Sequence, residues 1–326
     1  MNILYTCDNN YIWIMEISVI SLFENNRSAS ELSVYLLGEK ISDENKELLG
    51  NIAERYKRKI IVIDIPQFDI PEYLVSERWP LSAFTRLFSG ILLPENIEKI
   101  LYLDCDTIVN GNIMKLEDLE MKNNIFCGIK DCISAVYKKN IGLNDNDVYI
   151  NAGVLLIDLK KLRAFDVNKA INEYMNKYTR VISYADQDIL NGIFSGKIGY
   201  LQPQYNVMTI DAVHTYEQIQ MLRKPTCFYS KEEMTNAVND PKIIHYTTNM
   251  LVIRPWFRDS DHPFKKEFEK YMKMSTQGNL ALKKMKLGNT AKIIKIIHVF
   301  PDKIAYRILG FIHAELKPRY VRMKAR

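Results

Sequence analysis

Short runs of apolar and β-branched residues alternate with longer stretches of helical periodicity through most of the chain. The short runs predict six strands, over Asn2–Thr6, Leu32–Leu37, Ile60–Ile65, Ile100–Leu103, Ile125–Ile129 and Gly153–Leu159. Several of them are almost continuously apolar, which is typical of strands in a sheet that is covered on both faces. Because helical segments separate the strands, the pattern predicts an α/β fold with a mostly parallel sheet and right-handed crossovers.

Three helices are predicted between these strands. The first is an apolar stretch over Ile14–Phe23, and the second is a polar stretch over Ser42–Tyr56 whose first residue is a capping serine. The third covers Leu81–Leu93, started by Pro80 and stopped before Pro94. Ligands of such folds bind beyond the carboxyl ends of the strands. Polar residues that directly follow a strand are therefore candidates for a functional site.

The last fifty residues carry a different pattern. Residues 283–326 contain 12 Lys/Arg and 2 Asp/Glu, a charge of +10, whereas the rest of the chain contains 32 basic and 37 acidic residues, a charge of −5. Ile304, Ile308, Ile312 and Leu316 recur every four residues, with basic side chains off the stripe. The pattern predicts an α/β domain over residues 1–275 and a basic amphipathic helical segment over 276–326. Such a helix either binds an anionic membrane surface or packs on the domain, and both interpretations stay open.

The composition is that of a folded globular protein, with 47% hydrophobic and 25% charged residues. The five cysteines are scattered without a C-x-x-C pair, which argues against a disulfide framework or a thiolate zinc site. The amino terminus does not resemble a signal peptide, and no apolar run is long enough to span a bilayer. These features predict a cytoplasmic protein, with peripheral attachment to the inner face of the membrane open through the tail. The body has no basic stripe with interleaved aromatic residues, which argues against nucleic-acid binding.

The strongest local signal is a pair of carboxylates at the end of a buried strand. Ile100–Leu103 runs directly into Asp104 and Asp106, which one residue separates. If the chain turns there, both carboxylates converge on one cation. Such oxygen ligands suit Mg²⁺ or Mn²⁺, which in turn binds the phosphates of a nucleotide diphosphate. The alternative is a solvated strand end, because Asp is common in turns.

Two further loops carry candidate residues. After the first strand, Asp8 and Tyr11 offer hydrogen-bonding and stacking groups for a nucleotide base, although an Asp there also suits an Asx-turn. Asn151 precedes Ala152 and Gly153, whose small size permits either close approach of a ligand or tight packing. Each loop thus has a structural as well as a functional interpretation.

Candidate residues also occur later in the chain. Asp186 and Asp188 open an amphipathic helix, where acidic residues also stabilise the helix dipole. His245 follows two isoleucines on a predicted strand and is a candidate third metal ligand, although a lone His is more often structural. Arg254 then begins an Arg-Pro-Trp segment.

In this order the segments resemble glycosyltransferase family 8, which includes bacterial lipopolysaccharide galactosyl- and glucosyltransferases and glycogenin. The resemblance covers roughly residues 1–256. It rests on the opening strand and loop, Thr85-Arg86-Leu87, Leu-Tyr-Leu-Asp-Cys-Asp, Asn-Ala-Gly-Val-Leu-Leu-Ile, Asp-Gln-Asp-Ile-Leu-Asn and the late histidine. It implies the nucleotide-sugar-binding GT-A fold and a retaining hexosyltransferase that uses Mn²⁺ (or Mg²⁺). The implied donor is UDP-galactose or UDP-glucose, and the implied acceptor is a glycan or lipid-linked oligosaccharide of cell-surface polysaccharide synthesis.

The resemblance also implies a role for each matching residue. The residues implied to contact the nucleotide are Asp8, Tyr11, Asp104, Asp106 and Arg254. Those implied to bind the metal are Asp104, Asp106 and His245. Those implied to contact the donor sugar are Arg86, Asp131, Asn151, Asp186 and Gln187. The implied catalytic residues are Gln187, Asp188 and Arg86.

Retention of the anomeric configuration requires either a covalent intermediate or attack on the face from which the leaving group departs. Gln187 matches the family residue nearest the reacting carbon, but an amide is a poor nucleophile. Asp188 carries a carboxylate whose reach the sequence leaves open. We therefore expect same-face attack, with the metal and Arg86 stabilising the departing UDP, whose oxygen helps to deprotonate the acceptor.

One segment departs from the family pattern. In the family a Gly and then Lys-Pro-Trp follow the late histidine closely, whereas Tyr246–Ile253 separates His245 from Arg254 here. The Gly is absent and Arg replaces Lys, so the reach of this cation to a phosphate differs.

Two other functions stay open. A metal-dependent nucleotidyltransferase or phosphohydrolase would use the same carboxylates, but no Gly-rich or Walker-type phosphate loop supports it. A non-catalytic sugar-nucleotide-binding protein would explain the altered segment, but the intact acidic motifs argue against it.

Overall fold

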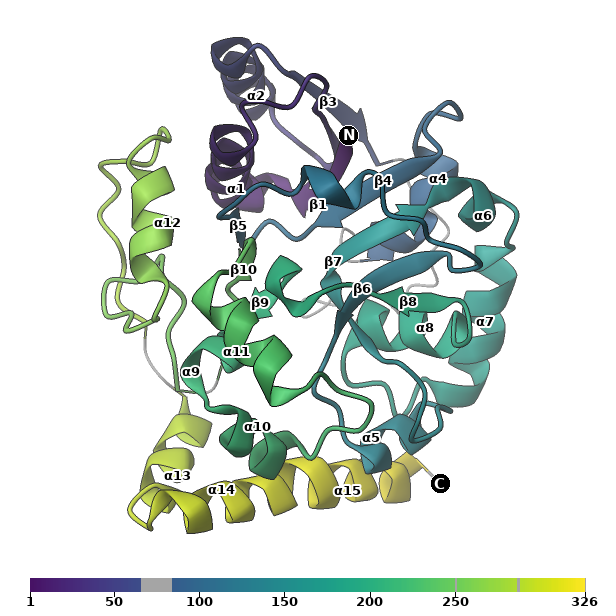
Figure 1. Ribbon diagram of the computed structural model, residues 1–326, viewed down its shortest axis with the longest axis vertical. Coiled ribbons are helices and arrows are strands. Elements are labelled where there is room, and N and C mark those ends of the chain that lie inside the picture. The colour runs from purple at the N-terminus through teal and green to yellow at the C-terminus, as the bar shows by residue number, and fades with distance from the viewer. Residues whose placement is uncertain (66–83, 250, 286–287, 326) are drawn as a thin grey trace.

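The computed structural model describes residues 1–65, 84–249, 251–285 and 288–325. A seven-stranded sheet lies at the centre, in the order β3-β2-β1-β4-β7-β6-β8 (Figure 1). Its strands are β1 (Asn2–Asp8), β2 (Ser33–Glu39), β3 (Lys59–Asp64), β4 (Lys99–Leu103), β6 (Phe126–Lys130), β7 (Ile150–Asp158) and β8 (Ile198–Tyr200). β7 runs antiparallel to β4 and β6, and the other neighbouring strands pair in parallel. The predicted α/β fold with a mostly parallel sheet is therefore confirmed.

Helices cover both faces of the sheet, because strand side chains alternate between two apolar cores. Tyr5, Leu101 and Val154 belong to one core, whereas Leu4, Tyr102 and Leu155 belong to the other. The helices on the first face are α1 (Ile12–Asn25) and α2 (Asp43–Tyr56), and α12 (Lys265–Met272) packs against α1. Those on the second are α4 (Ser89–Leu92), α6 (Leu159–Arg163), α7 (Val167–Tyr178) and α8 (Ala185–Ile193).

The predicted helical boundaries hold for some segments and not for others. Ser42 caps α2 by accepting a hydrogen bond from the Asn45 N–H, as predicted. Of the predicted helix over 81–93, residues 81–83 lie outside the described part. The remainder is a 3₁₀ turn at Thr85–Phe88 followed by the single turn of α4. The described part of the segment is therefore helical as predicted, with a 3₁₀ portion, and the guanidinium of Arg163 donates to carbonyls at its end and after it, those of Gly90, Pro94 and Ile97.

A small second sheet lies beside the end of β4. It contains β5 (Thr107–Val109), β10 (Ile243–His245) and β9 (Val207–Met208) in that order. β10 pairs antiparallel with β5 and parallel with β9. Of these three strands only β10 was predicted from the sequence. Around them lie α9 (Thr209–Val213), α10 (Tyr216–Arg223) and α11 (Lys231–Asn239).

The carboxyl-terminal segment forms a row of helices along one edge of the molecule, below α10 and α5 (Ala135–Asn140) in Figure 1. The row contains α13 (Asn289–Ile297), α14 (Asp302–Gly310), π-helical turns at Phe311–Leu316 and α15 (Lys317–Ala325). Small residues allow close contact: a Cβ on Gly310 would lie 1.9 Å from the Met221 carbonyl oxygen, and the Ala314 carbonyl accepts a hydrogen bond from the Ser134 hydroxyl. Tyr306 adds a hydrogen bond between its hydroxyl and His214 of the body. The row thus packs on the body, one of the two predicted arrangements.

Among the described residues, no helix combines the length and the apolar character that a bilayer crossing needs. All five cysteines are described and free.

Candidate active site

Asp104 and Asp106 follow β4 at the edge where the parallel strands end. The chain turns at Cys105 and Asp106 before β5 begins at Thr107. Cys105 is buried, with its thiol in contact with the Thr6 carbonyl, and the turn brings both carboxylates to the same side. The pairing of β5 with β10 brings His245 beside them, with Nε2 3.2 Å from Asp106 Oδ1 and 3.6 Å from Asp104 Oδ2. In the described part of the chain, ligand atoms of these three residues lie within 4.8 Å of one another.

A glycine of β7 leaves room for this group. The Gly153 carbonyl accepts a hydrogen bond from the Asp104 N–H at 2.8 Å, so its Cα lies directly beside the carboxylate. A Cβ at this position would lie 2.2 Å from Cε1 of His245 and 2.8 Å from Oδ2 of Asp104. Two carboxylates and an imidazole that converge in this way form a donor set suited to a divalent cation.

The charges in the group favour an ionised Asp106. Burial alone would raise the pKa of Asp106, but the charge and hydrogen bond of His245, together with Arg254, hold that pKa at about 2. Burial also tends to lower the pKa of His245, but Asp106 and Asp104 raise it above its ordinary value. Asp106 is therefore ionised at neutral pH, the state in which a carboxylate binds a cation.

Arg86 joins the carboxylates to α8. Its buried guanidinium lies 3.0 Å from Asp104 Oδ1 and 3.1 Å from Asp186 Oδ2, and it donates to the Ala152 carbonyl at 2.6 Å. The guanidinium also lies 4.3 Å above the ring of Tyr102, whose hydroxyl donates to Asp104. Burial raises the pKa of Asp186 to about 6, although Arg86 acts in the opposite direction. Three predicted site residues, Arg86, Asp104 and Asp186, are thus in contact.

A row of buried amides extends from His245 to the other candidate residues. The amide nitrogen of Asn151 donates to Gln187 Oε1 at 3.0 Å, and Gln187 Nε2 donates to Asp131 Oδ2 at 3.0 Å. Asn206 lies between Asn151 and His245, at 2.9 Å from the first and 3.0 Å from the second. The structure therefore brings Asp131, Asn151 and Gln187 together and connects them to His245.

Asp188 lies on the same helix but within the protein interior, with a side chain that is 0% exposed. One oxygen accepts hydrogen bonds from the Tyr137 hydroxyl and from two backbone N–H groups before α8, and the other accepts from the Tyr149 hydroxyl. The Tyr149 hydroxyl also accepts from Gln187 Nε2 at 3.1 Å. Both Asp188 oxygens are thus engaged within the protein, and the carboxylate reaches Gln187 through Tyr149.

The loop after β1 approaches the carboxylates through Arg254. One oxygen of Asp8 accepts hydrogen bonds from the N–H groups of Asn10 and Tyr11, the Asx-turn of the structural interpretation. Arg254 lies 3.4 Å from the Tyr11 hydroxyl and 3.1 Å from Asp106 Oδ2. Tyr11 and Arg254 therefore lie beside the predicted metal ligands, and Asp8 shapes the turn that presents Tyr11.

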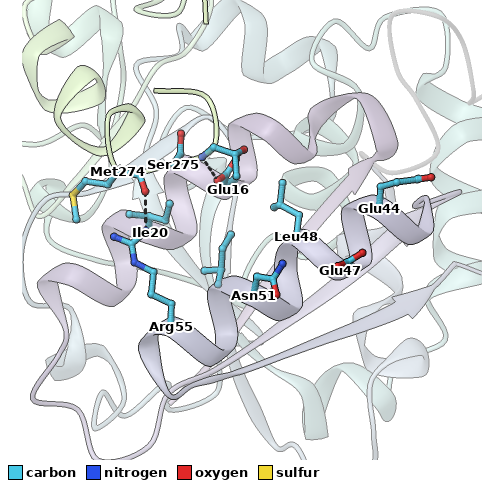
Figure 2. A pocket seen from close by; sticks show the side chains of 11 residues that line it. Glu16, Ile20, Glu44, Glu47, Leu48, Asn51, Arg55, Met274 and Ser275 are labelled. Atoms are coloured by element: carbon cyan, nitrogen blue, oxygen red, sulfur yellow. Dashed lines mark hydrogen bonds between the residues drawn. The ribbon is translucent and has the colours of Figure 1, made fainter. Parts of the chain in front are cut away.

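A hollow of about 410 Å³ lies elsewhere, between α1, α2 and the segment after α12 (Figure 2). Glu16 lines it and accepts hydrogen bonds from the N–H and hydroxyl of Thr276. Ser18, two residues further along α1, points to the opposite side and contacts Thr107 of β5. The hollow is therefore on the outer side of α1, away from the carboxylates.

Four residues of this arrangement were not identified from the sequence: Tyr102, Tyr137, Tyr149 and Asn206. For Tyr102 there was a signal, because strand alternation places it on the same side as Asp104 two residues later. Asn206 lies in no recognised motif and is 39 residues away from His245 in the chain. Only the pairing of β9 with β10 brings it to the site.

The chain matches the family model for glycosyl transferase family 8 over residues 2–260. It is 33% identical to a Haemophilus influenzae protein whose name assigns it only provisionally as a glycosyltransferase. That match covers 65% of this chain and 64% of the relative, so the chain spans slightly less than two thirds of that protein. The lipopolysaccharide 1,2-glucosyltransferase of Escherichia coli K12 is 27% identical, over 82% of this chain and 76% of the relative.

Solved structures show the same fold. The galactosyltransferase LgtC, crystallised with donor and acceptor sugar analogues, superposes with a TM-score of 0.71 at 27% identity, over 85% of this chain and 96% of LgtC. The matched family region contains all the carboxylate, imidazole and amide residues described above. The chain belongs to glycosyltransferase family 8.

Proposed function

We propose that this chain transfers a hexose, galactose or glucose, from a UDP-sugar to a glycan or lipid-linked oligosaccharide, with retention of configuration. The observation that carries the proposal is the connection of two groups: Asp104, Asp106 and His245 on one side, Asn151 and Gln187 on the other. The first group suits a metal-bound diphosphate, and the second offers amide groups to sugar hydroxyls. The sugars that relatives transfer by name, glucose and galactose, support the hexose.

Asp104, Asp106 and His245 would hold Mn²⁺ or Mg²⁺. A cation bound there would supply positive charge that stabilises the diphosphate leaving group. Arg86 adds a fixed positive charge beside Asp104 and Asp186, and Tyr11 and Arg254 would contact the nucleotide and its phosphates. Asp8, Asp131 and Asp186 complete the residues that we assign to the donor.

The geometry favours same-face attack over a covalent intermediate. Gln187 Oε1 already accepts hydrogen bonds from Asn151 and from the Ala152 N–H, and both Asp188 oxygens are engaged by other donors. We therefore assign Asp188 to positioning, through Tyr149. In the proposed step the bond from the anomeric carbon to the phosphate oxygen breaks while the acceptor oxygen bonds to that carbon. The acceptor proton passes to the departing phosphate oxygen.

A panel of UDP-sugars tests this function. Incubation of the chain with each sugar nucleotide and Mn²⁺ should release UDP slowly by hydrolysis, fastest with UDP-galactose or UDP-glucose and not at all with EDTA. Release of free phosphate or consumption of nucleoside triphosphate would favour a phosphohydrolase or nucleotidyltransferase instead. UDP-sugar binding without any turnover would favour a non-catalytic binding protein.

The carboxyl-terminal row of helices supports a second part of the proposal, contact with an anionic membrane surface. While small residues pack on the body, Ile304, Ile308, Ile312 and Leu316 are 37–47% exposed on the opposite side. Val299, in the connection before α14, is 84% exposed. Basic side chains lie beside this apolar stripe, so the positive charge of the segment complements anionic lipid headgroups. A lipid-linked acceptor would be found at the same surface.

Replacing Ile308, Ile312 and Leu316 together by Glu should reduce sedimentation of the chain with phosphatidylglycerol-containing vesicles by about tenfold or more, because it removes apolar contact area and adds negative charge. Replacing Ile91, Leu119 and Tyr200, exposed apolar residues of the body, by Glu adds the same charge elsewhere and should reduce sedimentation less. Equal effects of the two triple variants, or none from the first, would count against a membrane surface on the tail.

A further inference from the structure

Asn206 is a fully buried residue that connects the two groups of the site. It follows a 3₁₀ turn at Pro203–Tyr205 and precedes β9, and its side chain is 0% exposed. Because β9 pairs in parallel with β10, the Asn206 amide lies beside His245, 3.0 Å from Nδ1. Its other end lies 2.9 Å from Asn151 Oδ1. One amide thus contacts both a metal-ligand candidate and a sugar-pocket candidate.

Backbone N–H groups determine which way these amides point. The N–H of Gly153 can only donate, and it donates to Asn151 Oδ1 at 2.9 Å. The atom of Asn206 that also faces Asn151 Oδ1 must then be the donor nitrogen. This leaves the Asn206 oxygen toward His245, so Nδ1 of His245 carries the proton and donates it. Nε2, which faces the two carboxylates, keeps its lone pair when the imidazole is neutral.

The same reasoning applies to the amides at the other end of this group, Asn151 and Gln187. The Ala152 N–H donates to Gln187 Oε1 at 3.1 Å, so this oxygen is an acceptor and the Asn151 nitrogen donates to it as well. Gln187 Nε2 therefore points toward Asp131 and Tyr149. Two consecutive N–H groups of β7, those of Ala152 and Gly153, thus determine which end of each side-chain amide between His245 and Gln187 donates and which accepts.

We propose that Asn206 is a positioning residue that performs two separable tasks. Its oxygen holds His245 in the tautomer and orientation that present Nε2 to a cation, as outer partners of metal-bound histidines generally do. Its nitrogen holds Asn151, which in turn fixes the carboxamide of Gln187. The inference rests on the proposed function, because it assigns Asn206 to the same metal and sugar groups.

Two substitutions separate the tasks. Asn206→Leu removes both hydrogen bonds, and the affinity of the chain for Mn²⁺ in the presence of UDP should fall about tenfold or more. Asn206→Asp keeps an acceptor for the His245 Nδ1–H but loses the donor to Asn151. Its Mn²⁺ affinity should stay within about threefold of the parent, while kcat for UDP-sugar hydrolysis falls by about tenfold or more. Mn²⁺ affinity is measured from the electron paramagnetic resonance signal of the free ion, so it does not depend on turnover.

A matched control is Asn26→Leu. Asn26 is also fully buried and uses both ends of its amide, donating to the Leu22 carbonyl and accepting from the Ile113 N–H. This variant should lower the unfolding temperature and leave Mn²⁺ affinity unchanged. Unchanged Mn²⁺ affinity in Asn206→Leu, or equal losses of affinity in both Asn206 variants, would overturn the proposal. If the parent chain itself fails to bind Mn²⁺ with UDP, the proposed function fails first, so the two failures are distinguishable.

Discussion

Replacing Asp106 by Asn is expected to lower the rate of sugar transfer at least about a hundredfold, which corresponds to roughly 2.7 kcal/mol of barrier. The Asp106 carboxylate lies 3.2 Å from the His245 imidazole and 3.1 Å from the Arg254 guanidinium, so its negative charge interacts directly with both side chains. An amide keeps the shape but cannot supply the anionic oxygen that a divalent cation prefers. Transfer rates and Mn²⁺ affinity of the purified variant measure the effect.

Asp118→Asn is the matched control for this substitution, because Asp118 is exposed and lies outside the site. Asp118→Asn removes the same charge and should leave the transfer rate and the Mn²⁺ affinity unchanged. The unfolding temperature of Asp106→Asn should fall, because the lowered pKa of Asp106 means that its charge stabilises the fold and the variant leaves His245 and Arg254 without it, so circular dichroism must confirm that the variant is folded at the assay temperature. Turnover close to that of the parent chain would refute the role assigned to Asp106.

Replacing Gly153 by Ala is expected to weaken Mn²⁺ binding about tenfold or more and to lower transfer in proportion. The added methyl would lie 2.2 Å from His245 Cε1 and 2.8 Å from Asp104 Oδ2, so one of these side chains must move. Overpacking of this kind costs typically about 1–3 kcal/mol of stability, which thermal unfolding would detect.

Gly50→Ala provides the comparison. Gly50 lies in α2, and a Cβ there would meet nothing within 4 Å, so the change should stabilise the chain by roughly 0.5–1 kcal/mol. Mn²⁺ affinity should not change. If Gly153→Ala bound Mn²⁺ as tightly as the parent chain, the close approach of His245 and Asp104 to Gly153 would not be needed for binding a cation.

Much of the fold was predictable because apolar runs and helical periodicity report burial directly. Six of the seven strands of the central sheet were found within a few residues, β8 was missed, and the cap of α2 was found at Ser42. β7 begins earlier than predicted, at Ile150, because Lys130 of β6 pairs with that residue. The hydrophobic pattern of one segment contains no information about such pairing with another strand. Two strands of the small second sheet, β5 and β9, have three and two residues and are too short to produce a pattern.

The site was predictable wherever motifs place chemistry next to a strand end. Asp104, Asp106 and His245 do converge, and Arg86 lies between Asp104 and Asp186. The burial of Asp188 was not evident, because acidic residues in a first helical turn are usually solvated. The contacts of Asn206 depend on tertiary pairing, so no local pattern contains them.

The small second sheet affects where the folded chain undergoes local unfolding. His245 is held at the carboxylates by a three-residue strand between two equally short or shorter partners, whereas β1 and β2 pair over seven residues. Segments with few backbone pairings exchange their amide protons through local fluctuations, well before the whole domain unfolds. Amides of β10 should therefore exchange faster than those of β1, and occupation of the cluster by a ligand should slow them selectively.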